Sequence, residues 1–185
     1  MKVKNLDRFI NKIQCSRNRI TDSAVKELRN FIYNSNCGKV RFEEMSMKAM
    51  GISKTDECVL NIKVLEIYTE YMLYIILHEI SHQYQYKKYG KDLVLDIYTD
   101  SLKIELAVEK LLWLESVADR LAIKKMKSIF NTLGKKPIEI KPRYLNLTDT
   151  DYLKSHIVKI REDVKKLGLE TIEDINNHIH NNISE

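Results

Sequence analysis

Apolar residues recur three and four positions apart over most of the chain, which is the spacing of one face of an α-helix. The segments predicted as helices are residues 3–14, 24–32, 64–89, 101–131, 149–167 and 171–181. Turn residues 34–38 end the second segment, and Gly90 ends the third. Two short runs, residues 39–47 and 56–63, predict strands, and residues 134–147 predict an extended connection.

This order of elements predicts an α+β fold that is mostly helical. A small β-sheet is expected next to the helix over residues 64–89, and additional helices are expected at the C-terminal end. The chain of 185 residues is long enough to bury one core, so a single domain over residues 1–185 is expected. Its motif-bearing core spans about residues 39–131, and its C-terminal helical extension spans about residues 149–181.

Composition and charge narrow the class of protein. The formal net charge is +5, but the lysines are spread along the chain, whereas a nucleic-acid surface needs basic residues on one face. Three distant cysteines without a Cys-x-x-Cys pair indicate buried, reduced thiols. The chain begins without an apolar segment, and its longest apolar run is too short for a membrane span. We therefore expect a cytoplasmic protein that binds no membrane, with nucleic acid a less favoured partner.

The stretch LHEISHQYQY, residues 77–86, carries the clearest chemistry in the chain. On a helix, His78 and His82 lie on one face four residues apart, so both imidazoles can reach one metal ion, with Glu79 beside it. The surrounding helix is apolar nearly all round and should be buried, so these polar side chains need partners. A metal site meets that need. The alternative is that each imidazole bonds a carbonyl and Glu79 pairs with a lysine.

A third ligand is predicted on the helix over residues 101–131. Glu115 lies in the middle of an apolar stripe that includes Val108, Leu111 and Ala122, where an ionised carboxylate needs a partner. We expect Glu115 to face the two histidines and complete a metal site, with Asp119 accepting the free N–H of one histidine. Two alternatives stay open: an ion pair of these acids with a lysine or arginine, and His156 as the third ligand.

The two motifs together resemble a known family. His78-Glu79-Ile80-Ser81-His82, followed by Glu115-Ser116-Val117-Ala118-Asp119, is similar to the gluzincin pattern HExxH…ExxAD. The order of elements over residues 39–129 looks most like the small soluble minigluzincin peptidases, including the ImmA/IrrE-type family. The resemblance implies a zincin-like fold and one zinc ion per chain. It also implies that His78, His82 and Glu115 are ligands, Glu79 is the general base and Asp119 orients a histidine.

The implied activity is that of a zinc metallopeptidase acting on a protein or peptide substrate. Glu79 would take a proton from a zinc-activated water and return it to the leaving amine. A substrate peptide would add to the edge of the strand over residues 57–63. The candidate donors to the oxyanion are Tyr144, Tyr152 and His156.

Two other functions fit the same residues. One is a regulatory or binding protein that keeps a zincin scaffold without catalysis, although such a protein needs no general base. The other is a DNA-associated protease of the SprT-like kind, which HQYQYKKYG, residues 82–90, faintly resembles. That group uses a third histidine, and none lies between His82 and His156.

Overall fold

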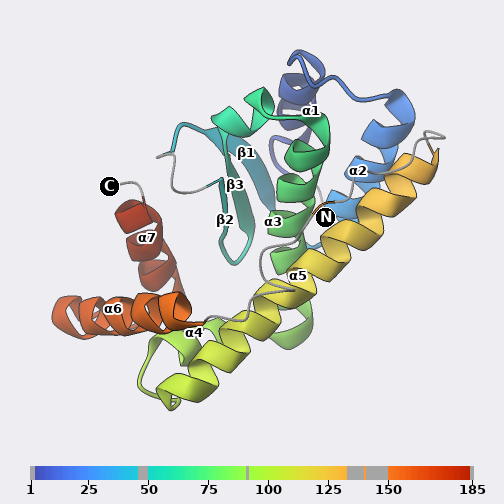
Figure 1. Ribbon diagram of the computed structural model, residues 1–185. Coiled ribbons are helices and arrows are strands. Elements are labelled where there is room, and N and C mark those ends of the chain that lie inside the picture. Colours follow the sequence, from blue (N-terminus) through green and yellow to red (C-terminus); the bar gives the residue numbers. More distant parts are fainter. Residues whose placement is uncertain (1–2, 46–49, 91, 133–139, 141–149, 184–185) are drawn as a thin grey trace.

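The computed structural model describes residues 3–45, 50–90, 92–132, 140 and 150–183 (Figure 1). Its elements, in chain order, are α1 (Leu6–Gln14), α2 (Asp22–Asn34), β1 (Lys39–Glu43), β2 (Gly51–Ser53), β3 (Glu57–Asn61), the 3₁₀ helix η1 (Ile62–Glu66), α3 (Thr69–Tyr89), α4 (Asp92–Tyr98), α5 (Ile104–Thr132), α6 (Asp151–Leu167) and α7 (Ile172–Ile183). The predicted α+β class, mostly helical with a small sheet and C-terminal helices, is confirmed. The predicted connection over residues 134–147 lies outside the described residues, apart from Ile140.

The sheet has three strands in the order β1-β3-β2. β1 runs parallel to β3, with Val40 opposite Cys58, and β2 runs antiparallel to β3, with Gly51 opposite Leu60. The prediction that a peptide could add to the strand over residues 57–63 is therefore wrong, because β3 has a neighbour on both sides. The edge strand on the α3 side of the sheet is β2, whose three residues carry no periodic pattern that the sequence could reveal.

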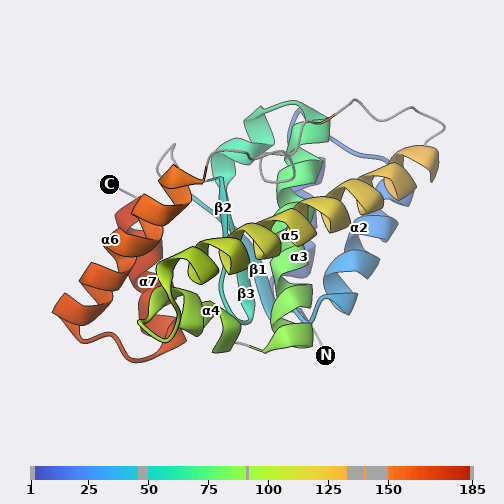
Figure 2. The same ribbon diagram turned by 60° about the horizontal axis from the view of Figure 1, so that its bottom comes forward.

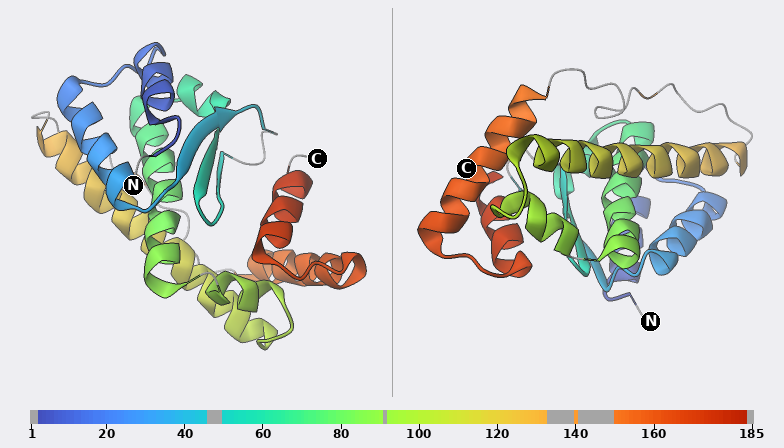
Figure 3. Two further views of the ribbon diagram at one scale, coloured as in Figure 1. Left: turned by 180° about the vertical axis from the view of Figure 1, so that it is seen from behind. Right: turned by 90° about the horizontal axis from the view of Figure 1, so that it is seen from below.

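A first hydrophobic core surrounds the sheet. Helices α1 and α3 pack against the sheet, α2 lies on the side of α3 away from the sheet, and α5 crosses α3 and contacts α2 (Figures 1 and 3). Fully buried side chains join α3 to the C-terminal half of α5: Leu73, Ile76, Leu77 and Ile80 from α3, and Ala122, Met126 and Ile129 from α5. Each large apolar side chain in this set contributes about 1.5–3 kcal/mol by leaving water. This packing fixes α3 and α5 relative to each other.

A second hydrophobic core lies at the other end of α5. There α4, α6 and α7 gather around the N-terminal half of α5 (Figure 2). Its most buried members are Ile97, Ala107, Ile157 and Ile175. Because α5 contributes to both cores, it is the element that joins them. The assignment of residues 1–185 to a single domain stays a prediction.

The long helix predicted to start at Val64 starts later in the structure. Residues Ile62–Glu66 form η1, the backbone is extended at Ile67, and α3 begins at Thr69. Two polar side chains cause the break. The Asn61 side chain accepts a hydrogen bond from the Lys63 N–H, and the Asn18 amide donates to the carbonyls of Leu65 and Ile67. The Asn61 contact is local, but Asn18 comes from a distant part of the chain, so periodicity alone could not locate the break.

Other boundaries agree with their sequence signals. Thr21 caps α2 by accepting from the Ala24 N–H, and Thr171 caps α7 by accepting from the Asp174 N–H. Gly90 ends α3 with a φ of 81°. The short helix α4 was not predicted. Cys37 and Cys58 are buried as expected, whereas Cys15 is exposed, and all three are free thiols. In the described part of the chain, no helix is long and apolar enough to span a membrane.

The packing of α3 on α5 gives a stability prediction. Replacing the fully buried Ala122 with leucine adds volume between the two helices and should lower the free energy of unfolding by about 1–3 kcal/mol. The matched control is Lys124→Leu on the exposed side of α5, which should change it by no more than about 0.5 kcal/mol. Denaturant unfolding measures both. Equal effects of the two substitutions would contradict this packing.

Candidate metal centre

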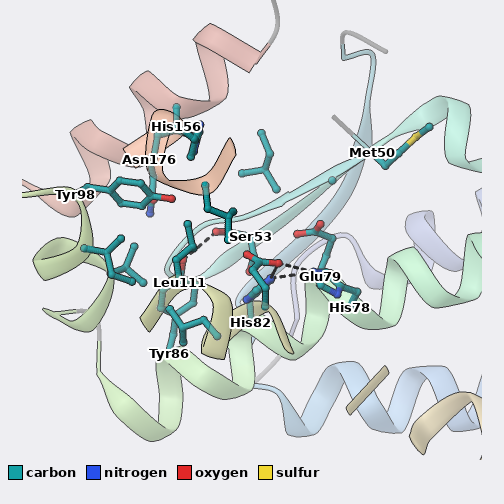
Figure 4. Close-up of a pocket in the computed structure, with 18 of the residues that line it drawn as sticks. Met50, Ser53, His78, Glu79, His82, Tyr86, Tyr98, Leu111, His156 and Asn176 are labelled. Atoms are coloured by element: carbon teal, nitrogen blue, oxygen red, sulfur yellow. Dashed lines mark hydrogen bonds and ion pairs between the residues drawn. The ribbon is translucent and has the colours of Figure 1, made fainter. Parts of the chain in front are cut away.

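A pocket of about 730 Å³ lies between the two hydrophobic cores. One wall is formed by the edge strand β2 and by α3, and the others by α4, α5, α6 and α7 (Figure 4). The polar side chains at the α3–α5 side of this pocket are His78, Glu79, His82 and Glu115. The pocket therefore opens onto the residues that the sequence motifs selected.

Three side chains converge there at short distances. His78 Nε2 lies 3.2 Å from both His82 Nε2 and Glu115 Oε2, and His82 Nε2 lies 3.7 Å from Glu115 Oε2. The structure thus brings together the predicted group of two histidines and one glutamate, which could hold a metal ion. Among the described residues, the ion-pair partners of Glu115 are these two histidines, as predicted, and no lysine or arginine pairs with it.

The carboxylate of Asp119 fixes the orientation of His78. Asp119 Oδ1 lies 2.9 Å from His78 Nδ1, and because a carboxylate can only accept, Nδ1 carries the proton. When the imidazole is neutral, as a metal ligand has to be, the lone pair of Nε2 faces Glu115. Asp119 is fully buried and also accepts a hydrogen bond from the Tyr74 hydroxyl at 2.5 Å. The predicted contact of Asp119 with a motif histidine is therefore present, and Tyr74 strengthens it.

A glutamine that the sequence analysis missed performs the same task for His82. Gln85 Oε1 lies 2.7 Å from His82 Nδ1, while Gln85 Nε2 donates to the Leu114 carbonyl at 2.5 Å. Since its NH₂ group is used on that carbonyl, the amide oxygen must accept from His82 Nδ1–H. In the neutral imidazole, Nε2 of His82 is then also free to bind a metal. A buried glutamine on an apolar helix, one turn after the motif, was the available signal.

The pKa shifts of His78, His82 and Glu115 indicate that this group stabilises positive charge on its imidazoles. Burial alone would lower the pKa of His78, but hydrogen bonds to Asp119 and Glu115 raise it to about 10. Burial likewise opposes the charged form of His82, and Glu115 nevertheless raises its pKa. Burial alone would raise the pKa of Glu115, but the charges of the two histidines hold it far below its usual range. Without a metal, protons on the imidazoles balance the buried carboxylate.

The same arrangement fits a tetrahedral metal ion. Ligand atoms about 2.0–2.1 Å from a zinc ion lie roughly 3.3–3.4 Å from one another, close to the separations of 3.2, 3.2 and 3.7 Å found here. Once a metal displaces the extra protons, both imidazoles present an unprotonated Nε2, because Asp119 and Gln85 bind the protons that remain on Nδ1. A divalent cation can replace the protons that Glu115 attracts. The donor set therefore suits a metal ion in both geometry and charge.

Glu79 lies beside the ligand group and packs against the edge strand. A Cβ on Gly51 would come within 2.5 Å of Glu79 Cγ and 2.9 Å of its Cδ, so the side chain occupies the space that glycine leaves. Burial raises the pKa of Glu79, although the nearby histidines oppose the shift. Among the described residues, no lysine or arginine forms an ion pair with Glu79, contrary to the alternative of a buried salt bridge.

His156 and Tyr152 also line the pocket, but from α6. His156 is not part of the group that could hold a metal, so its candidacy as third ligand is wrong. Burial and the charge of Lys159 lower its pKa, so the imidazole is neutral at pH 7. Tyr144, the remaining candidate donor, lies outside the described residues. His156 and Tyr152 are thus placed where a substrate could contact them.

Comparison of the chain with protein-family models, with curated proteins and with solved structures finds no match. The case for a function therefore rests on the residues and geometry of this chain.

The raised pKa of His78 predicts that metal affinity increases with pH. A proton held up to about pH 10 competes with the metal, and this competition weakens as pH rises toward that value. The apparent affinity should rise about tenfold per pH unit for each proton released. Competition titrations with a chelator between pH 6 and 9 measure the slope. Asp119→Asn should reduce the slope of metal affinity against pH. An apparent affinity that does not change between pH 6 and 9 would contradict competition between protons and the metal.

Proposed function

We propose that the protein is a zinc-dependent metallopeptidase with a zincin-like fold, binding one zinc ion per chain. The observation that carries the proposal is the convergence of His78 Nε2, His82 Nε2 and Glu115 Oε2 at tetrahedral spacing beside Glu79. Two histidines and one glutamate form a ligand set of catalytic zinc sites, which keep a fourth position open. Here the group borders a pocket that a substrate can enter.

Zinc is the ion that suits this donor set best. Imidazole nitrogens and a single carboxylate favour zinc over magnesium or calcium, which take mainly oxygen ligands. Other first-row metals share these donors, so metal analysis has to identify the ion. A bound zinc ion would supply a Lewis acid that lowers the pKa of water and polarises a carbonyl group.

Glu79 is the residue proposed to move protons. Its carboxylate can accept a proton from water in the pocket and return it to the amine of the leaving peptide. Burial, by raising its pKa, brings this carboxyl closer to the neutral range in which a group can both accept and donate. Gly51 leaves room for its side chain at the edge strand. The protein or peptide substrate would lie in the pocket along β2, the edge strand, because β3 is occupied on both sides.

The alternatives differ from this proposal at identifiable residues. A binding protein on the same scaffold would need the metal ligands but not Glu79. A DNA-associated SprT-like protease would need a third histidine as ligand, and His156 lies outside the ligand group.

Zinc content and peptidase activity of three variants test the proposal. Wild type should hold one zinc per chain, and Glu115→Ala should lose it, because removing the carboxylate leaves two ligands. Glu79→Gln should keep the zinc and lose at least about a hundredfold in activity, the usual effect of removing a general base. Glu109→Ala removes an exposed acid from α5, the helix that carries Glu115. It is the matched control and should match wild type in zinc content and in activity. Elemental analysis and mass-spectrometric detection of cleaved peptides from a proteome-derived library measure the two properties.

Three outcomes would contradict the proposal. They are a metal-replete wild type without zinc, a Glu115→Ala variant that retains it, and a Glu79→Gln variant that cleaves peptides at the wild-type rate. Zinc binding without cleavage by wild type would favour the non-catalytic binding protein.

The contact between Gly51 and Glu79 gives a further prediction. Gly51→Ala places a methyl group where Glu79 Cγ and Cδ now lie, so the general base has to move while the three metal ligands stay in place. We expect kcat to fall about tenfold or more, since general-base catalysis depends on hydrogen-bond reach, with zinc content unchanged. Ile52→Val, the next position on β2, serves as the control. Equal kcat values for Gly51→Ala and wild type would show that Glu79 does not depend on this contact.

A further inference from the structure

The wall of the pocket opposite the metal centre contains a buried polar side chain whose N–H donor group forms no hydrogen bond with the described residues. Asn176, on α7, is 7% exposed, lines the pocket and has no hydrogen-bond partner for Nδ2 among the described residues. Figure 4 shows it with Tyr98 and His156, on the side of the pocket away from Glu79. This region belongs to the second hydrophobic core, where Ile175 and Ile179 are its neighbours along the helix.

An unpaired amide in such a place lowers stability. A buried donor that has given up water without gaining a partner costs free energy, and an apolar side chain of the same shape avoids that cost. Leucine would fit the composition of this core, as Leu111, Leu114 and Leu153 nearby show. Buried polar groups left unpaired in a folded protein call for an explanation, and ligand binding is one that the pocket supplies.

The chemistry of the wall selects the kind of ligand. The Asn176 amide offers N–H donors, and Tyr98 and His156, which pack edge-to-face with ring centroids 6.1 Å apart, can also donate. No lysine or arginine is among the described residues that line the pocket, so the wall around Asn176 offers hydrogen-bond donors without a charged side chain, and positive charge in the pocket is confined to the metal centre on the opposite side. A neutral oxygen acceptor, such as a peptide carbonyl, matches this wall better than a carboxylate does.

We propose that Asn176 is a substrate-binding residue whose amide donates a hydrogen bond to a backbone carbonyl oxygen of the bound peptide. The proposal rests on the peptidase function proposed above. It assigns α7 a role in binding: the peptide lies between the edge strand β2 and this helix. The contacts Lys54–Asn177 (2.9 Å) and Thr55–Glu173 (3.2 Å) hold the turn after β2 against α7, so both walls are in place before the peptide arrives.

The test compares substrate binding and stability in the same variants. Asn176→Leu removes the amide at similar size, Asn176→Asp replaces the N–H donors with an acceptor, and Glu162→Leu, an exposed polar position on the neighbouring helix α6, is the control. The probe is a library of hexapeptides acetylated at the N-terminus and amidated at the C-terminus. Their affinities are measured with zinc-loaded Glu79→Gln protein, which binds without cleaving. Melting temperatures are recorded in parallel.

We expect Asn176→Leu and Asn176→Asp to weaken binding of the tightest hexapeptide at least tenfold. Asn176→Leu should leave the melting temperature unchanged or raise it, whereas a structural role for the amide predicts a fall. Glu162→Leu should bind as the parent does. Parent-like binding by both Asn176 variants would overturn the proposal, as would a lower melting temperature of Asn176→Leu combined with parent-like binding by Asn176→Asp.

A second arm separates a backbone carbonyl from a terminal carboxylate as the acceptor. Peptides with a free C-terminus should bind no more tightly than their amides. A preference of tenfold or more for the free acid that disappears in Asn176→Leu would overturn the carbonyl assignment. If no hexapeptide binds the zinc-loaded protein, the peptidase proposal fails. In that case the melting temperature still tests the structural premise. A lower melting temperature of Asn176→Leu than of the parent would contradict the interpretation that the Asn176 amide is unpaired.

Discussion

The carboxylate of Glu115, partly buried between two imidazoles where α3 crosses α5, is the constraint on which the rest of the site depends. A carboxylate in a water-poor setting is costly unless positive charge meets it, and the ion-pair partners it has are His78 and His82. Protons on the two imidazoles or a metal ion could equally balance the charge of Glu115. Its Oε2 lies 3.2 and 3.7 Å from the two Nε2 atoms, and the tetrahedral spacing of all three ligand atoms favours a metal. Asp119 and Gln85 complete the arrangement by binding the remaining imidazole protons.

Helix α5 connects this centre to the rest of the molecule. Its C-terminal half packs in the first core against α3, and its N-terminal half packs in the second core with α4, α6 and α7. Glu115 lies near the junction, so one continuous helix carries one of the three candidate ligands and also packs against the helices of the far wall of the pocket. On the opposite side, Gly51 brings the edge strand against Glu79. The pocket is thus bounded on all these sides by packed helices and the edge strand.

The sequence predicted the metal group well because each ligand leaves a local signal. His78 and His82 share one face of a helix, and Glu115 interrupts an apolar stripe, so periodicity alone selects all three. Gly51 and Asn176 leave no such signal. The importance of Gly51 depends on the pairing of a three-residue strand, and that of Asn176 on how α7 packs over a pocket formed by distant elements. The break before α3 was missed for the same reason, since Asn18 reaches it from another part of the chain.

X-ray absorption spectroscopy of the zinc-loaded protein tests the central claim most directly, because it reports the atoms bound to the metal. Two imidazole nitrogens and one carboxylate oxygen, with a further light atom at the open position, should lie about 2.0–2.2 Å from zinc. A sulfur shell at about 2.3 Å, or the absence of imidazole scattering, would contradict a centre formed by His78, His82 and Glu115.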